Sequence, residues 1–157
     1  MNSRKYVFWT LILIVALVLT GILGSQFIRT SNALAGPRTL VGSWTTTVTP
    51  EGGEPSFVDA VIFSSDGTVT AMESDGRLGI GVWRKISGAS YAFNFWEFVN
   101  EGGAAMQIKI SSTIQLSKDG EHYSGPFTVE VRDTAGNLLG TGGGTASGDR
   151  QHVEPME

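Results

Sequence analysis

Between residues 40 and 147 the chain alternates apolar with polar residues, and turn residues break the alternation at short intervals. Successive side chains of a strand point to opposite faces, so a period of two indicates strands that bury one face. Turn pairs such as Asp66-Gly67 and Asp75-Gly76 fall between these runs and allow a positive φ at low cost. The pattern predicts eight strands: Leu40 to Thr49, Ser56 to Ser64, Thr68 to Glu73, Leu78 to Ile86, Ser90 to Asn100, Ala104 to Leu116, His122 to Arg132 and Asn137 to Ser147.

The connections between these runs are short, and no run has a helical period of useful length. Consecutive strands joined by hairpin-length turns form an antiparallel meander, and closing the meander removes its exposed edges. We therefore predict an all-β domain over residues 36–157, folded as an eight-stranded antiparallel up-and-down barrel.

An apolar leader precedes this domain. Residues 6–24 are free of charge and follow Arg4 and Lys5, and Ala33 and Ala35 occupy the two small-residue positions of a signal-peptidase site. Residues 1–35 are thus predicted to be a signal peptide, or an uncleaved signal-anchor helix, since 19 apolar residues can span a bilayer. Both outcomes export the barrel, to the periplasm or the extracellular space, or tethered to the outer face of the cytoplasmic membrane through residues 6–24.

Composition excludes several classes of function. The chain has no cysteine, which rules out disulfides, thiolate metal sites, cysteine nucleophiles and a lipoprotein anchor. Its net charge of −4 becomes −7 once the three basic residues of the leader are set aside, so nucleic acid is not an expected partner. His122 and His152 lack metal-ligand spacing and are expected to be solvated. We predict no metal and no cofactor.

The first predicted strand contains Gly42-Ser43-Trp44, and Arg150 follows the last one. This pattern resembles the calycin group of barrels, namely lipocalins, fatty-acid-binding proteins and the streptavidin type, across about residues 40–150. The resemblance implies a lipocalin-like domain whose end is closed by Arg150 stacked over Trp44. The lipocalin disulfide and C-terminal helix have no counterpart here. The predicted barrel also resembles barrels of the allene-oxide-cyclase and dirigent type, which likewise have eight strands and some of which are enzymes.

Alternation also predicts the barrel interior, which we expect to include Ile110 and a set of large apolar side chains. That set is the candidate lining of a ligand site: Phe63, Trp83, Phe93, Phe95, Met106, Ile108, Tyr123 and Phe127. Pockets for small molecules are mostly apolar and usually exceed about 300 Å³. A void below about 300 Å³ would remove the ligand-binding interpretation and favour a function of the outer surface.

The segment from Tyr91 to Val99 is unusual because both of its faces are apolar. A closed barrel covers only the inward face, so Trp96 and Phe98 on the outward face would need another cover, such as a second copy of the chain, a loop or a membrane surface. These two residues are the candidate contact for a homo-oligomer.

Two acidic residues share faces with aromatic ones. Glu97 lies on the face of Phe93 and Phe95, where it is either desolvated with a raised pKa or at the barrel rim in water. Asp59 poses the same question, and we expect it at an exposed edge. Facing carboxylates would suit glycoside hydrolysis, although the sequence does not place these two opposite each other. The candidate catalytic groups are Glu97 and Tyr91.

Three functions follow from these observations. The first is an exported barrel that binds a small apolar or aromatic ligand. The second is a filled barrel that acts as an envelope or interaction protein through its outer aromatic surface. The third is a cofactor-free cyclase or isomerase, for which a shaped cavity and one or two polar groups suffice.

Overall fold

The computed structural model describes residues 39–101 and 103–155, with only the main chain of Glu101. The predicted leader, with its apolar helix, its possible membrane contact and its cleavage site at Ala33 and Ala35, lies outside the described residues. Within the described part, the structure contains no helix that is long and apolar enough to cross a membrane.

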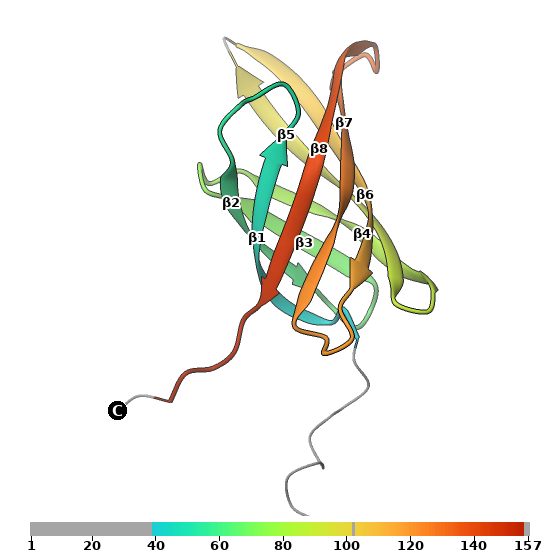
Figure 1. The fold of residues 1–157 in the computed structure, drawn as a ribbon. Coiled ribbons are helices and arrows are strands. Elements are labelled where there is room, and N and C mark those ends of the chain that lie inside the picture. Colours follow the sequence, from blue (N-terminus) through green and yellow to red (C-terminus); the bar gives the residue numbers. More distant parts are fainter. Residues whose placement is uncertain (1–38, 102, 156–157) are drawn as a thin grey trace, which may run out of the picture. The chain divides into compact units, whose positions relative to one another are not determined.

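The described chain is a closed antiparallel barrel in which every strand pairs with its neighbours in sequence (Figure 1). This confirms the predicted eight-stranded up-and-down architecture. The strands are β1 (Gly42–Pro50), β2 (Phe57–Phe63), β3 (Thr68–Glu73), β4 (Leu78–Ser87), β5 (Ser90–Glu101), β6 (Ala104–Leu116), β7 (His122–Asp133) and β8 (Leu138–Arg150).

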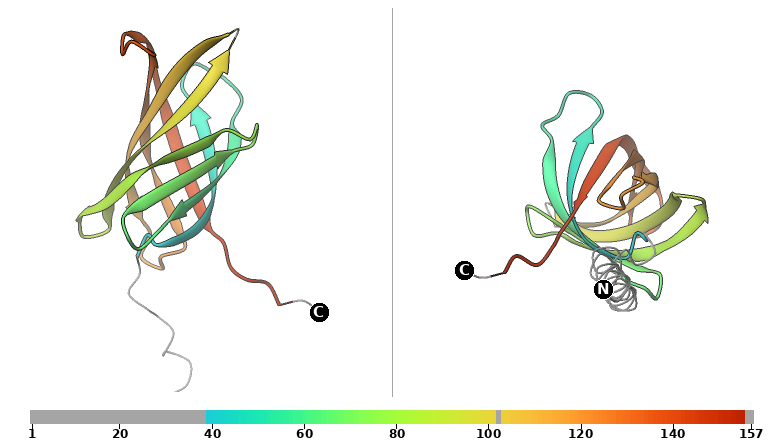
Figure 2. Two further views of the ribbon diagram at one scale, coloured as in Figure 1. Left: turned by 180° about the vertical axis from the view of Figure 1, so that it is seen from behind. Right: turned by 60° about the horizontal axis from the view of Figure 1, so that its bottom comes forward.

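The turns divide between two ends of the barrel. The β2–β3, β4–β5 and β6–β7 turns lie at the lower end in Figure 1, where β1 begins and β8 ends. The β1–β2, β3–β4, β5–β6 and β7–β8 connections lie at the upper end. The β4–β5 turn projects beyond the barrel wall, as both views of Figure 2 show.

Pairing of β1 with β8 closes the barrel and sets Trp44 directly opposite Arg150. The guanidinium carbon lies 4.2 Å from the centre of the indole ring. Arg150 also donates hydrogen bonds to the carbonyl oxygens of Thr39, Val41 and Gly120 at 2.6 to 2.8 Å. These contacts tie the chain before β1 and the β6–β7 turn to the end of β8.

Leu40 was predicted to begin the first strand, but the strand begins at Gly42. Leu40 instead is fully buried at the lower end, and its carbonyl oxygen accepts a hydrogen bond of 3.0 Å from the Trp44 indole nitrogen. The alternation of residues 40–49 could not show that the chain bends at Leu40.

Aromatic rings fill the lower half of the interior. Phe63 makes edge contacts with Trp83, Phe93 and Tyr123 at centroid distances of 5.4 to 6.1 Å, and Tyr123 contacts Trp44 at 5.0 Å. Glycines on neighbouring strands make room for such rings: a Cβ on Gly148, the partner of Tyr123 on β8, would lie only 2.2 Å from that ring. The lower half is therefore a packed core.

Candidate functional site

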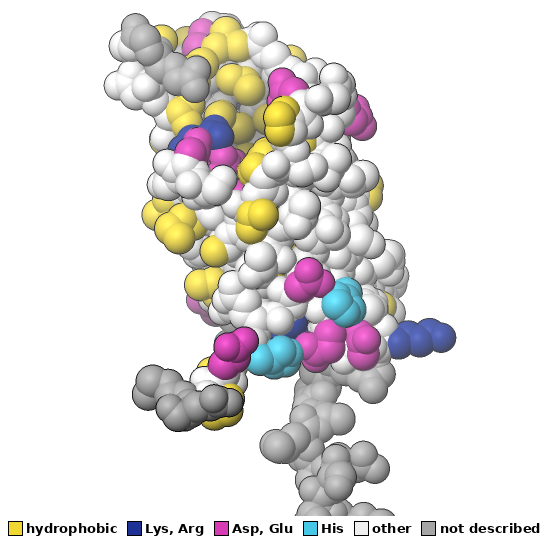
Figure 3. All heavy atoms as spheres, turned by 60° about the vertical axis from the view of Figure 1, so that its left-hand side comes forward, with side chains coloured by type: hydrophobic (Ala, Val, Ile, Leu, Met, Phe, Trp, Pro, Cys, Tyr) yellow, Lys and Arg dark blue, Asp and Glu magenta, His cyan; other side chains and the backbone are white. Residues whose placement is uncertain are grey.

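The upper half of the barrel contains a cavity of about 190 Å³ that opens at the upper end. Figure 3 shows apolar side chains in this hollow and charged groups of both signs at its edge. Its apolar wall is formed by Val48, Phe57, Val61, Phe93, Phe95, Ile108, Ile110, Phe127, Val129, Val131 and Ala146. Its polar groups come from Thr46, Asp59, Glu73, Arg77, Glu97 and Tyr123.

Most of the predicted ligand-contacting residues lie in this wall, namely Phe93, Phe95, Ile108, Tyr123 and Phe127. The other three do not line the cavity. Phe63 and Trp83 belong to the lower core, where the Trp83 indole nitrogen donates to the Ser64 carbonyl oxygen at 2.9 Å. Met106 lies near the upper end of β6 and is only half-buried. Alternation assigned these residues to the inner face but could not say at which height the interior is hollow.

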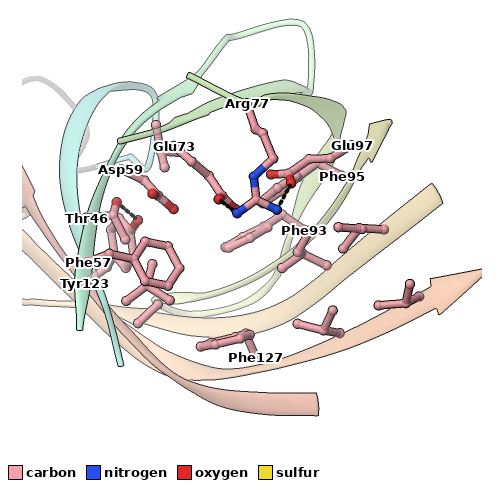
Figure 4. A pocket seen from close by; sticks show the side chains of 17 residues that line it. Thr46, Phe57, Asp59, Glu73, Arg77, Phe93, Phe95, Glu97, Tyr123 and Phe127 are labelled. Carbon is pink, nitrogen blue, oxygen red and sulfur yellow. Dashed lines mark hydrogen bonds and ion pairs between the residues drawn. The ribbon is translucent and has the colours of Figure 1, made fainter. Parts of the chain in front are cut away.

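The polar side of the cavity is built by β2, β3, β5 and the turn that joins β3 to β4 (Figure 4). Asp59 on β2 is the direct cross-strand neighbour of Glu73 on β3. Glu97 projects inward from β5 beside Phe95. Arg77 reaches over these groups from the turn, so one guanidinium faces three carboxyl groups.

Asp59 and Glu97 are both buried, with exposed fractions of 6% and 1%. The expectation that Asp59 lies at an exposed edge is therefore wrong, and of the two positions considered for Glu97 the structure shows the desolvated one. Alternation did place both on inward faces, but rim and interior positions share the same alternation, and only the height of the surrounding strands distinguishes them.

The hydrogen bonding of these carboxyl groups is incomplete. Asp59 Oδ1 and both carboxyl oxygens of Glu97 are buried, and no N–H or hydroxyl group of the described chain donates a hydrogen bond to them. In its protonated form, Glu97 hydrogen-bonds the neighbouring carboxyl group of Glu73. The nearest cation to Glu97 is Arg77, whose Nη1 lies 3.7 Å from Oε2. Arg77 makes its short contacts elsewhere, with Glu73 through Nη2 and with Asp75 through Nε at 2.7 Å.

Burial, followed by the nearby charge of Glu73, raises the pKa of Asp59 to about 7 against the opposing effect of Arg77. Burial and Glu73 likewise raise the pKa of Glu97 to about 7. Both carboxyl groups thus exchange protons near neutral pH. Tyr123 differs, since burial raises its pKa to about 12 and its hydroxyl shares a hydrogen bond of 2.5 Å with Thr46.

Tyr91, the second candidate catalytic residue, does not reach this site. It is buried in the lower core with its ring 5.8 Å from that of Trp83. Glu97 is six positions further along β5, which corresponds to about 20 Å along a strand. The structure therefore does not bring the two candidate catalytic groups together.

The sequence interpretation missed Glu73 and Arg77, although a signal for them was present. The two residues flank the Asp75-Gly76 turn, where Gly76 has a φ of 89° and Glu73 and Arg77 are joined by a backbone hydrogen bond of 2.9 Å. Oppositely charged residues on the two sides of a tight turn face each other across the hairpin. Their position over the cavity depends on where the hairpin ends relative to β2 and β5.

The two histidines lie at the lower end, far from this cavity along the barrel. Both are exposed as expected, but each is paired: His122 Nδ1 lies 2.6 Å from Asp149, and His152 Nε2 lies 2.6 Å from Glu121. Among the described residues, no three acidic or histidine side chains form a group that could hold a metal ion.

Comparisons with protein-family models, with curated proteins and with solved structures find no match to this chain. The likeness to calycins thus consists of the Gly42-Ser43-Trp44 motif, the Trp44 and Arg150 contact, and the closed antiparallel barrel. The barrel itself is established by the strand pairing.

Proposed function

We propose that the protein is exported and binds a small apolar or aromatic molecule in the upper half of its barrel. The observation that carries this proposal is a cavity that combines an apolar wall with buried carboxyl oxygens lacking hydrogen-bond donors. Binding pockets have this composition, in which apolar walls supply affinity and a few polar groups orient the ligand.

The volume restricts the size of the ligand. About 190 Å³ is below the limit of roughly 300 Å³ set in the sequence analysis, and this removes a drug-sized ligand enclosed by the barrel. An engineered apolar cavity of about 150 Å³ nevertheless binds benzene. A molecule with one ring or a short chain fits these dimensions.

Thermal shift measurements with one-ring and short-chain compounds test the proposal. We expect stabilisation of the wild-type domain, and loss of the effect in Ala146→Leu, because Ala146 is buried in the cavity wall and a larger side chain there occupies the ligand volume. Ala89→Leu makes the same change in the exposed β4–β5 turn and should bind as the wild type does. Flat responses across the library, together with native mass spectra that show no retained molecule, would remove this function.

The outer face of the barrel favours a second candidate function, self-association. Exposed apolar side chains cover adjacent strands: Val58 and Ile62 on β2, Met72 on β3, Leu78, Ile80 and Val82 on β4, and Phe98 on β5. Trp96 lies among them, half-buried and paired with Ile80. Contiguous apolar surface of this kind is typical of interfaces. Sedimentation of the wild type against Phe98→Ser tests it, and a monomer at all concentrations would remove it.

The third candidate function, a cofactor-free cyclase or isomerase, keeps only one of its two candidate catalytic groups. Glu97 is buried with a pKa near 7, as a general acid or base requires, but Tyr91 is remote. The cavity wall is mostly apolar, which does not suit a saccharide. Ligand binding accounts for the same carboxyl groups without a reaction.

A further inference from the structure

The cavity contains more acidic than basic groups, and this imbalance limits what can bind there. Asp59, Glu73 and Glu97 line it, together with one cation, Arg77. The guanidinium makes its short contacts with Glu73 and with Asp75 in the turn. Among the described residues, Asp59 therefore has no ion pair, and Glu97 has one cationic contact, of 3.7 Å, beside its side-chain hydrogen bond with Glu73. A ligand group placed here enters a region of unneutralised negative charge.

The same groups also lack hydrogen-bond donors. Asp59 is 94% buried and Glu97 is 99% buried, as their exposed fractions of 6% and 1% show, and both side chains are in the cavity wall. Asp59 Oδ1, Glu97 Oε1 and Glu97 Oε2 receive no hydrogen bond from an N–H or hydroxyl group of the described chain. Buried polar groups are nearly always paired, and a charged donor forms the stronger bond with a carboxylate. When these carboxyl groups are ionised, a cationic donor would complete their hydrogen bonding.

Aromatic rings lie next to this acidic group. Phe93 and Phe95 stack at a centroid distance of 6.1 Å on the inward face of β5. Glu97 is the next inward residue of the same strand, on the upper side of Phe95. Figure 4 shows Phe57 and Tyr123 beside Asp59, whereas Phe127 lies on the opposite wall of the cavity. An apolar body would lie between these rings while its polar end faces the carboxyl groups.

We propose that the cavity selects a small organic ammonium, with its one-ring or short aliphatic body in the apolar part and its charged nitrogen donating to the unpaired oxygens of Asp59 or of Glu97. This inference rests on the proposed ligand-binding function and specifies the head group of the ligand. It excludes carboxylate and phosphate ligands, because they would add charge of the same sign to a buried acidic group.

The pH dependence follows from the groups that face the site. Asp59 from β2, Glu73 from β3, Asp75 and Arg77 from the turn, and Glu97 from β5 are the charged groups, and Tyr123 from β7 stays neutral. Protonated carboxyl groups do not attract an ammonium. With a pKa near 7, the ionised fraction of one carboxyl group rises about tenfold between pH 6 and pH 8, so the affinity should rise by about the same factor.

Three probes with the same ring but different head groups test the proposal by calorimetry at pH 8: 2-phenylethylamine, 2-phenylethanol and 3-phenylpropanoate. We expect the amine to bind at least tenfold more tightly than the alcohol, and the carboxylate not to bind. At pH 7, where carboxyl groups with a pKa of about 7 are about half protonated, amine binding should release protons, and titration in buffers of different ionisation enthalpy detects this release. In the double variant Asp59→Asn, Glu97→Gln the preference for the amine should disappear, while the alcohol still binds and so reports an intact cavity.

The control is Asp149→Asn, which removes one charge from a carboxylate that is 75% exposed at the lower end and should leave the preference unchanged. Equal affinity for amine and alcohol in the wild type, or a preference that survives in the double variant, would overturn the ammonium proposal and leave ligand binding standing. Failure of all three probes to bind would overturn both.

Discussion

The two ends of the barrel satisfy their buried polar groups in different ways. At the lower end, the Trp44 indole donates to Leu40, and the Arg150 guanidinium donates to three carbonyl oxygens while it covers the indole ring. At the upper end, Asp59 and Glu97 are as well buried as the lower core, yet they have carboxyl oxygens without donors.

The lower end therefore resembles a structural closure, and the upper end resembles a binding site. Paired and packed groups contribute to stability, whereas buried unpaired carboxyl groups reduce it and persist where they serve another purpose. Changes at the lower end should mainly lower stability, and changes at the upper end should mainly alter binding and pH dependence.

The largest effect is expected for Trp44→Ala, which removes a fully buried indole and its hydrogen bond to Leu40. Truncation of a buried aromatic should lower the free energy of unfolding by about 3 to 5 kcal/mol, as measured by denaturant titration. Trp96→Ala is the matched control on the outer face, where the indole is only half-buried, and should cost less than about 1.5 kcal/mol. Equal losses in the two variants would contradict the structural role of the lower end.

The upper end should make stability depend on pH. The folded pKa of Asp59 and of Glu97 is about 7, above the ordinary values of 3.8 and 4.5, so the folded state binds more protons than the unfolded state between these limits. Their contribution is therefore fully present in acid and is lost as the pH rises through 7. We expect each of the two groups to lower the free energy of unfolding by about 2 to 3 kcal/mol from pH 5 to pH 8.

Variants in which an uncharged amide replaces one of the buried carboxyl groups test this pH dependence more strictly. Asp59→Asn and Glu97→Gln should each flatten the pH dependence and raise the melting temperature at pH 8, because a desolvated charge is removed. Asp149→Asn, an exposed position, should leave the profile unchanged. A wild-type stability that rises from pH 5 to pH 8 would contradict the burial of the two carboxyl groups in solution.

A smaller loss is expected for Arg150→Lys. Lysine keeps the charge but lacks the planar fork that reaches Thr39, Val41 and Gly120 at the same time. We expect a cost of about 1 to 2 kcal/mol and faster hydrogen exchange of the Trp44 indole. Arg84→Lys, at an exposed position of β4, should change neither measurement. An unchanged Arg150→Lys variant would show that the lower end is closed by packing alone.

The smallest effect on stability is expected for Phe98→Ser, since this side chain is 78% exposed. The free energy of unfolding of the monomer should change by no more than about 0.5 kcal/mol. A loss above about 2 kcal/mol, measured at a concentration where the protein is monomeric, would show that the outer face packs against part of the domain.

The sequence by itself determined the strand content and the inward faces. Seven of the eight predicted strands begin within one residue of the observed ones, because alternation and turn residues are local properties of the chain. The inward faces of β5 and β7 follow from the same period of two. The pairing of Trp44 with Arg150 came instead from a resemblance in motif, since residues 106 apart leave no local signal.

Tertiary structure decided where the interior is filled and where it is open. Phe63 and Phe95 have equivalent patterns in the sequence, but only Phe95 lines the cavity. Asp59, Glu73, Arg77 and Glu97 converge because the pairing register sets β2, β3 and β5 at matching heights around a closed barrel. Register and closure depend on contacts between distant strands, so the burial of a carboxyl group and its lack of a donor could not be inferred from the order of residues alone.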